Sequence, residues 1–234
     1  MKVEVAVTKA SKWAARESGD TLEMVERPHG GISFVLVDGQ RSGRAAKAIS
    51  NLVARKAISE LAEGVRDGAA ARAAHDYLYT HRSGQVSATL NIASVDMSSN
   101  TLVLSRNSQC PIVLVTPERT IDVLDDPSVQ LGVHRGTKPQ ITEVPLEPKL
   151  AAIVYTDGLK MAGARSGPVY DIPETVRSLI EEDVPSATEL AEALLQRALA
   201  LEEDRPRDDI SILALCITEK DEDDVRRLTV SLPL

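Results

Sequence analysis

Four aspartates in the sequence stand where an apolar, strand-like run begins or ends. Asp38 and Asp157 each follow such a run and are each followed by glycine. Asp20 and Asp208 each stand just ahead of one. A carboxylate at the end of a buried strand is held on a rigid element and faces whatever lies at the rim of the sheet. A glycine after the aspartate lets the backbone turn sharply and brings a carbonyl oxygen close to a ligand.

If these four side chains converge, they form an all-oxygen site of the kind that holds hard divalent cations such as Mg²⁺ or Mn²⁺. Carboxylates gathered inside a fold demand cations, because like charges cannot share a dry site unpaired. Zinc is disfavoured, since the histidines are scattered and the sequence has no HExxH or Cys/His metal spacing. An Asp-Gly pair alone is also typical of a simple turn. The spacing does not decide between one shared site and four separate turns.

The charge and cysteine content limit the class of partner and the compartment. The chain carries 27 Lys and Arg against 35 Asp and Glu, a net charge of -8, and it has no basic patch. This balance argues against a nucleic acid partner. No run approaches the ~20 apolar residues of a membrane helix, and the N-terminus is too polar for a signal peptide. Since Cys110 and Cys216 lie far apart and outside any CxxC motif, we expect a cytoplasmic protein without disulfides or membrane contacts.

Hydrophobic periodicity predicts about ten strands and two pairs of helices. Strands are expected at 3–7, 21–27, 32–37, 86–95, 101–106, 112–116, 120–124, 141–145, 151–155 and 210–217, and helices at 43–63, 69–81, 173–182 and 187–203, the last with Ser186 as its N-cap. Most strands are joined by turn signals rather than by helices, which indicates antiparallel sheets. The predicted fold class is therefore α+β, with a pair of antiparallel sheets between helical layers.

The chain is expected to form a single domain over residues 1–234. Its 43% hydrophobic content can fill a substantial core, and no linker or repeat interrupts it. Residues 219–234 are interpreted as an acidic turn followed by a weakly alternating segment from Val225 to Leu232. That segment is either an edge strand that closes a sheet or a contact with another subunit.

Five short motifs occur in order along nearly the whole chain. They are Ser18-Gly19-Asp20; Val37-Asp38-Gly39 followed by Ser42-Gly43-Arg44-Ala45-Ala46; Ser87-Ala88-Thr89-Leu90 with Asn107 and Pro111-Ile112; Leu131-Gly132-Val133 with Val154-Tyr155-Thr156-Asp157-Gly158-Leu159; and Arg207-Asp208-Asp209-Ile210-Ser211. Together they resemble the metal-dependent protein phosphatases of type 2C. They are most similar to the bacterial SpoIIE-like branch, which includes the stand-alone RsbX-like phosphatases of stress signalling.

The resemblance implies a four-layer αββα sandwich with two Mn²⁺ or Mg²⁺ ions at one rim. The metal roles that it implies are Asp38 bridging both ions, Asp20 and the Gly39 carbonyl on one ion, Asp157 and Asp208 on the other, and Asp209 as a support behind them. The implied chemistry is direct attack of a metal-bound water on the phosphorus of phosphoserine. Asp38 and Asp157 are then catalytic through the water that the metals hold, and no side chain acts as a nucleophile.

The sequence departs from this family near the second motif. Many relatives have a histidine, proposed as a proton donor, where this chain has Gln40. Gln40 cannot donate in that way, so the leaving oxygen would take its proton from solvent or from another metal-bound water. Arg16, four residues before Asp20, is a candidate for phosphate binding, with an exposed loop charge as the alternative. Arg41 and Arg44, beside the Asp-Gly motif, are candidates for contact with phosphate or with a partner. For Arg44 the alternative, which is slightly favoured, is a solvated position in the first helical turn.

The predicted function is a protein serine/threonine phosphatase that acts on phosphoserine of a bacterial signalling protein. By analogy within the family, the partner is an anti-sigma or stress-signalling regulator. The main alternative is a catalytically inactive, partner-binding domain of the same fold. Gln40 is the reason to consider it, and the presence of all four acids argues against it. A hydrolase of small phosphoesters and a plain structural domain, in which the aspartates never meet, are further alternatives.

Overall fold

Ten strands and five helices make up the described part of the chain, which is residues 1–15, 17–165, 167, 169–219 and 225–231 of this computed structural model. The strands are β1 (Lys2–Ala10), β2 (Asp20–Glu26), β3 (Gly31–Gly39), β4 (Ala88–Asp96), β5 (Thr101–Asn107), β6 (Ile112–Val115), β7 (Ile121–Leu124), β8 (Gln140–Pro145), β9 (Ala151–Tyr155) and β10 (Ile210–Thr218). The helices are α1 (Gly43–Ala62), α2 (Asp67–Arg82), α3 (Asp157–Lys160), α4 (Ile172–Leu179) and α5 (Ala187–Leu201).

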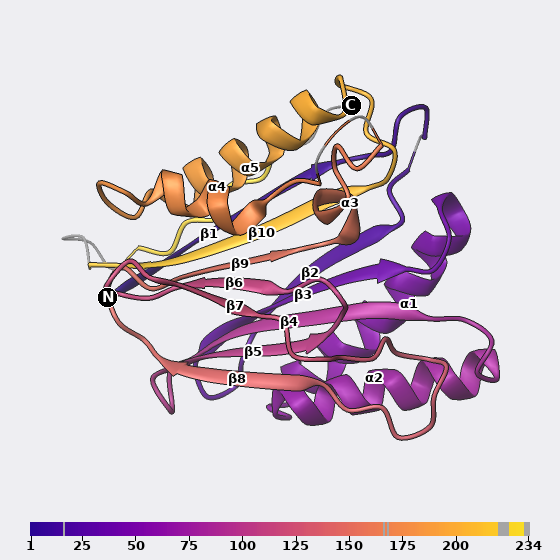
Figure 1. The fold of residues 1–234 in the computed structure, drawn as a ribbon. Coiled ribbons are helices and arrows are strands. Elements are labelled where there is room, and N and C mark those ends of the chain that lie inside the picture. The colour runs from indigo at the N-terminus through magenta and orange to yellow at the C-terminus, as the bar shows by residue number, and fades with distance from the viewer. Residues whose placement is uncertain (16, 166, 168, 220–224, 232–234) are drawn as a thin grey trace.

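The strands form two five-stranded sheets that stack between helices (Figure 1). The first sheet has the order β1-β10-β9-β6-β7 and lies under α4 and α5. The second sheet has the order β2-β3-β4-β5-β8 and lies against α1 and α2. Within both sheets the paired strands are antiparallel. The prediction of an α+β fold with an αββα sandwich is confirmed.

Side chains that alternate along the central strands build three apolar layers. In β9, Ile153 and Tyr155 pack with α4 and α5, whereas Val154 faces the second sheet. The third layer joins the second sheet to α1 and α2, where small residues of both helices allow close packing. Because β9 and β10 are buried on both faces, their sequences are almost continuously apolar, as strands with two covered faces require.

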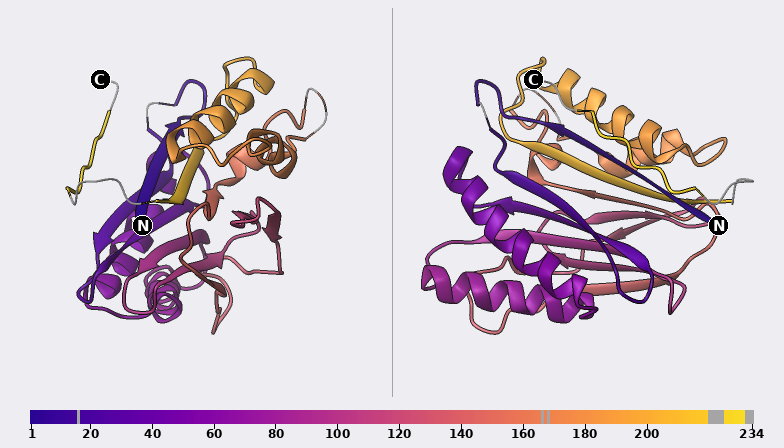
Figure 2. Two further views of the ribbon diagram at one scale, coloured as in Figure 1. Left: turned by 90° about the vertical axis from the view of Figure 1, so that its left-hand side faces the viewer. Right: turned by 180° about the vertical axis from the view of Figure 1, so that it is seen from behind.

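One predicted helix cap is present, one short helix was not predicted, and one predicted strand is absent from the described residues. Ser186 and Glu189 form a capping box at the start of α5, so the predicted N-cap is confirmed. The short helix α3 was not expected, because its Asp-Gly start is also a turn signal. The edge strand expected at the C-terminus is absent from residues 225–231, which lie outside both sheets in Figure 2. Residues 220–224 and 232–234 lie outside the described part.

No described helix is long and apolar enough to cross a membrane.

A buried ion pair ties the β2–β3 hairpin to the start of α2. The Arg27 guanidinium donates to Asp67 Oδ2 at 2.8 Å and to the Val65 carbonyl oxygen at 3.1 Å. The two charged side chains are only 7% and 6% exposed. The Ser94 hydroxyl donates to the other Asp67 oxygen and shares a hydrogen bond with Ser33. This network fixes α2 against the second sheet.

Replacing Asp67 with alanine should lower the free energy of unfolding by about 3 kcal/mol, because it leaves the Arg27 charge buried without its partner. Chemical denaturation of the variant and of Glu192→Ala, an exposed site on α5, measures this effect. Equal stability of the two variants would show that the network does not hold α2.

Candidate functional site

The sandwich brings the four predicted aspartates to one rim, where the two sheets meet. Asp20 and Asp38 are directly opposite each other across β2 and β3. Asp157 is the first residue of α3, directly after the Thr156 that ends the β9 segment, and Asp208 lies just ahead of β10, the neighbour of β9. Burial raises the pKa of Asp38 well above the ordinary range, and the charges of the other three acids raise it further. The pKa of Asp38 therefore reflects the charges of the other three acids.

Asp20 links the two sheets at this rim. Its Oδ2 accepts hydrogen bonds from Thr156 Oγ1 at 3.0 Å and from Ser211 Oγ at 2.6 Å, both on the first sheet's side. Its backbone oxygen accepts from Lys9 Nζ at 2.9 Å and from Lys47 Nζ at 2.7 Å. Asp20 is 1% exposed, and this burial raises the pKa of its carboxyl group. The hydrogen bonds from the hydroxyls of Ser211 and Thr156 partly lower that pKa. Asp20 is thus held in one position by both sheets.

The glycines after two of the aspartates allow backbones to approach closely. A Cβ atom on Gly39 would lie 2.1 Å from the carbonyl oxygen of Ala46 in α1, and a Cβ on Gly158 would lie 2.1 Å from that of Asp209. Neither glycine has a positive φ angle. The close approach of neighbouring backbone is therefore what requires glycine at both positions. It lets α1 and α3 pack against that backbone, which brings the adjacent aspartates to the rim.

Asp209 supports the loop that precedes β2. Its Oδ1 accepts the backbone N–H of Lys12 at 2.9 Å, and its Oδ2 accepts that of Gly19 at 2.7 Å. The residue is 5% exposed. Asp208, by contrast, is exposed, and its Oδ1 accepts the N–H of Asp209 at 3.0 Å. The two adjacent acids therefore differ: Asp209 uses both oxygens for the backbone, and Asp208 is open to a ligand.

The residues around the second motif lie as follows. The side-chain oxygen of Gln40 accepts the backbone N–H of Ser87 at 3.0 Å, and the backbone N–H of Gln40 donates to the Ser87 carbonyl oxygen at 3.1 Å. Gln40 thus continues the pairing of β3 with β4. Arg41 is exposed with φ at 82°, and Arg44 is exposed in the first turn of α1. Arg16 lies outside the described residues.

The charge and donor types at the rim fit divalent cations. Burial raises the pKa of Asp157, the charge of Asp208 raises it further, and Lys160 partly opposes this. The donors are all oxygens, which suits Mg²⁺ and Mn²⁺. Among the described residues, however, no group of three or more His, Cys, Asp and Glu side chains is placed so that it could hold a metal ion as it stands. The fit therefore rests on donor chemistry and uncompensated charge, without a closed coordination cage.

Sequence reasoning missed the groups that hold Asp20, namely Thr156, Ser211, Lys9 and Lys47. The signal for the two hydroxyls was present, because each lies inside a motif that also carries an aspartate. Lys9 and Lys47 could not be identified from the sequence, because they lie outside the motifs and donate to the backbone oxygen of Asp20.

Asp209→Ala should lower the free energy of unfolding by about 3 kcal/mol, because it leaves two backbone N–H groups without their acceptor. Asp209→Asn keeps one acceptor oxygen, so roughly half that loss is expected. Urea denaturation of both variants tests this, and an alanine variant as stable as the wild type would contradict the supporting role.

Removing the charge of Asp38 should stabilise the metal-free protein in a pH-dependent way. The folded state keeps a proton on Asp38 that the unfolded chain releases near the ordinary pKa of about 3.9. This stabilising contribution is complete below that value and is lost as the pH rises toward the raised folded pKa. In EDTA, the melting temperature of Asp38→Asn should therefore exceed that of the wild type by more at about pH 8 than at about pH 5. A difference that does not change with pH, as expected for the exposed control Asp122→Asn, would contradict the crowding of charge.

Solved structures of known phosphatases share this fold. The chain is similar to the type 2C phosphatase domain of SpoIIE from Bacillus subtilis, with a TM-score of 0.79 and 17% identity over 93% of this chain and 64% of that chain. It is also similar to the RsbU and RsbW domains of a Mycobacterium tuberculosis protein (TM-score 0.74, 18% identity, 92% of this chain and 60% of that one). The corresponding values for the SiaA type 2C domain of Pseudomonas aeruginosa are 0.71, 21%, 91% and 85%.

At these identities the likeness shows the fold, and this chain spans less than two thirds of the first two structures. No curated protein matches the chain. The sequence model of the stage II sporulation protein E (SpoIIE) family matches residues 28–218, which is most of the chain. The chain therefore belongs to the SpoIIE family of type 2C phosphatases.

Proposed function

We propose that this protein is a metal-dependent phosphatase that hydrolyses phosphoserine on a protein substrate with the help of two Mn²⁺ or Mg²⁺ ions. The observation that carries the proposal is the crowding of negative charge around Asp38 at the rim where the two sheets meet. A purely structural domain gains nothing from such crowding, because carboxylates held together without cations destabilise a fold. The fold and the family agree with the proposal.

In the proposed site, the carboxylate of Asp38 would be shared by both ions. Asp20 and the Gly39 carbonyl oxygen would help to hold one ion, and Asp157 and Asp208 would help to hold the other. When bound, the ions lower the pKa of a coordinated water and neutralise charge on the phosphoryl oxygens. This assignment requires the Asp157 and Asp208 side chains to turn toward Asp38.

The other residues of the rim position this ligand set. The hydroxyls of Thr156 and Ser211 hold one Asp20 oxygen, which leaves the second oxygen for an ion. Asp209 holds the loop ahead of Asp20 by two backbone hydrogen bonds. Because the amide of Gln40 is not an acid, the proton for the leaving serine oxygen would come from solvent or from another metal-bound water.

The exposed guanidinium groups at the start of α1 are the proposed phosphate contacts. Arg41 and Arg44 follow the Asp38-Gly39 motif directly and are open to a charged substrate. Arg16 remains a prediction from the sequence alone. Guanidinium groups suit phosphate because they offer two parallel N–H donors.

The proposed substrate is a phosphorylated anti-sigma or stress-signalling regulator. One structural neighbour carries RsbU and RsbW domains in a single chain, and another is described with the bacterial stressosome. A cytoplasmic location belongs to the same proposal, and the two buried cysteines, both free, agree with a reducing compartment.

A catalytically inactive, partner-binding domain is the second candidate. Two observations favour it: Gln40 occupies the place of a family histidine and is used for strand pairing, and the acids form no closed cage among the described residues. The two candidates differ in whether the rim does chemistry.

Hydrolysis of p-nitrophenyl phosphate with Mn²⁺, with Mg²⁺ and with EDTA separates these candidates. The phosphatase should require a divalent ion, and Asp38→Asn should lower kcat/KM on the order of 100-fold or more because it removes the carboxylate shared by both ions. Asp122→Asn, an exposed change on β7, serves as the control. No metal-dependent hydrolysis by the correctly folded wild type would leave the partner-binding domain as the better account.

A further inference from the structure

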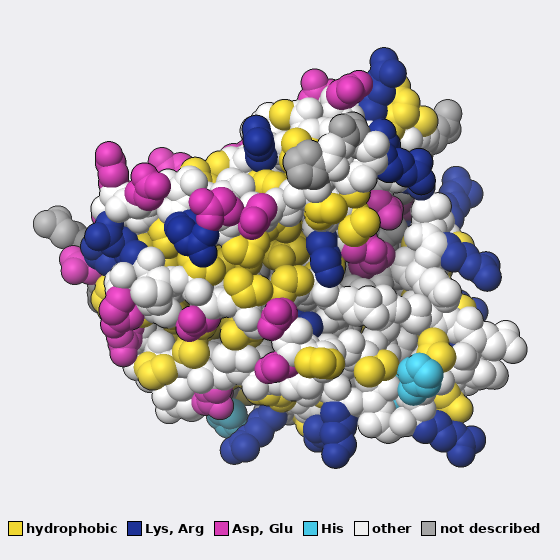
Figure 3. Space-filling model, viewed as in Figure 1, with side chains coloured by type: hydrophobic (Ala, Val, Ile, Leu, Met, Phe, Trp, Pro, Cys, Tyr) yellow, Lys and Arg dark blue, Asp and Glu magenta, His cyan; other side chains and the backbone are white. Residues whose placement is uncertain are grey.

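A groove runs along the outside of the first sheet, beside the candidate site. It consists of two adjoining cavities of about 320 and 300 Å³ that share Val169, Tyr170 and Asp171. The near cavity is also lined by Pro111, Tyr155, Lys160, Ile172 and Pro173, and the far one by Glu174, Thr175, Ser178, Arg197 and Leu201. Figure 3 shows hydrophobic side chains gathered in a hollow on this face of the molecule.

The near cavity is mainly apolar and shares the short helix α3 with the rim. Its lining includes Pro111, Ile172 and Pro173, together with Lys160, whose charge acts on the pKa of Asp157. Lys160 and Asp157 lie on the same single turn of α3. A side chain in this cavity would therefore belong to a residue close in sequence to a phosphoserine bound at the rim.

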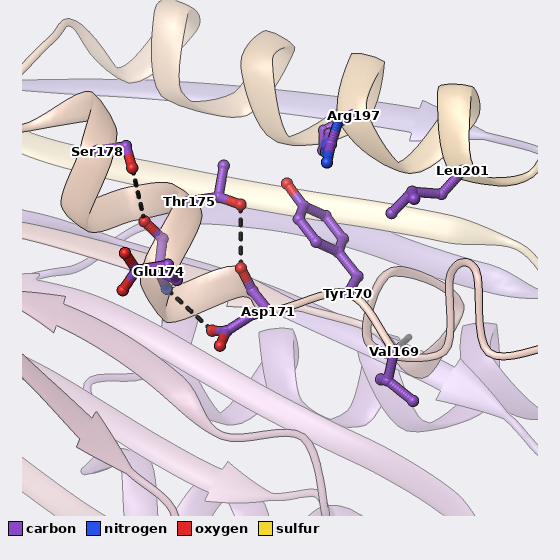
Figure 4. Close-up of a pocket in the computed structure, with 8 residues that line it drawn as sticks. All are labelled: Val169, Tyr170, Asp171, Glu174, Thr175, Ser178, Arg197 and Leu201. Atoms are coloured by element: carbon purple, nitrogen blue, oxygen red, sulfur yellow. Dashed lines mark hydrogen bonds between the residues drawn. The ribbon is translucent and has the colours of Figure 1, made fainter. Parts of the chain in front are cut away.

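The far cavity contains two polar groups that face each other, the Tyr170 hydroxyl and the Arg197 guanidinium. Tyr170 is 7% exposed, and its hydroxyl makes no hydrogen bond of ordinary length within the described part of the chain. Thr175 is near enough to lower the pKa of Tyr170, but its hydroxyl donates to the Asp171 carbonyl oxygen. Figure 4 shows the Tyr170 hydroxyl pointing toward Arg197 of α5. Within the described part of the chain, Arg197 makes no hydrogen bond or ion pair. A buried hydroxyl without a partner costs stability, so a ligand that accepts its hydrogen bond would be favoured.

The acids on the same cavity are already engaged. Asp171 Oδ1 accepts the backbone N–H of Glu174 at 3.0 Å and so caps α4. Glu174 pairs with Arg177 outside the cavity. Thr175 Oγ1 donates to the Asp171 carbonyl oxygen at 3.0 Å. Asp171 and Glu174 thus each have a protein partner, whereas the guanidinium of Arg197 has none among the described residues and complements a carboxylate.

We propose that this groove docks the phosphorylated segment of the substrate protein, with an apolar side chain in the near cavity and a carboxylate on Tyr170 and Arg197 in the far one. The inference rests on the proposed function, because the rim that would bind the phosphoserine and the near cavity meet at α3, which carries both Asp157 and Lys160. It gives the substrate a chemical description: a phosphoserine followed or preceded by an apolar residue and then by an acidic one.

A set of phosphoserine peptides tests this assignment. In a neutral background, one Leu and one Glu are moved independently through the positions on both sides of the phosphoserine. Each kcat/KM is divided by that of the same enzyme for p-nitrophenyl phosphate, which is too small to reach the groove. We expect one position at which Leu raises this ratio and, farther from the phosphoserine on the same side, one at which Glu raises it. At that position Glu should give a ratio about tenfold above that of the neutral background peptide.

Variants assign the preference to the groove. R197Q and Y170F should each lose the advantage of Glu, and Val169→Glu should lose that of Leu, since Val169 is 54% exposed and lines both cavities. Y170F removes only the unpaired hydroxyl, so its melting temperature should not fall. The matched control is R72Q, a change to an exposed guanidinium on α2 that lines neither cavity.

The outcomes separate the two proposals. Equal ratios for all peptides, with p-nitrophenyl phosphate hydrolysed, would overturn the docking groove and leave the phosphatase intact. Absent hydrolysis of p-nitrophenyl phosphate would count against the phosphatase itself. Fluorescence anisotropy with the same labelled peptides measures docking without turnover, and equal affinities of wild type and R197Q would overturn the groove.

Discussion

The hydrogen bonds from Thr156 and Ser211 to Asp20 are the interaction on which the rim depends. They cross from the first sheet to an aspartate of the second, at the edge where both sheets end. Because Asp20 lies directly opposite Asp38 on the next strand, fixing Asp20 also fixes where the central carboxylate can be. The same hydrogen bonds therefore hold the two sheets together at this edge and position the acids of the rim.

The arrangement holds like charges together, which opposes folding, and several features offset this. Gly39 and Gly158 let backbone segments approach so closely that no side chain would fit. Asp209 ties the β2 loop to the start of β10. Such crowding costs stability as long as no cation neutralises it. The proposed docking groove would add contacts with the residues on either side of the phosphoserine.

Much of this fold could be predicted from the sequence, because central strands with two covered faces leave continuous apolar runs and turn signals separate them. The capping box at Ser186 was visible for the same local reason. The helix α3 was not, since one turn carries no periodicity and begins with a turn-like Asp-Gly pair. The edge strand expected near Val225 failed because weak alternation does not supply a sheet to pair with. The acids could be identified by type and order, whereas their partners lie up to 191 positions away in sequence and required three dimensions.

The central claim is that the carboxylates at the rim bind two divalent ions through Asp38. Anomalous X-ray diffraction from crystals grown with Mn²⁺ tests it most directly. We predict two manganese peaks, both in contact with Asp38, one near Asp20 and the Gly39 carbonyl oxygen and the other near Asp157 and Asp208. A fully ordered rim without manganese, or manganese bound only at other surface acids, would contradict the account.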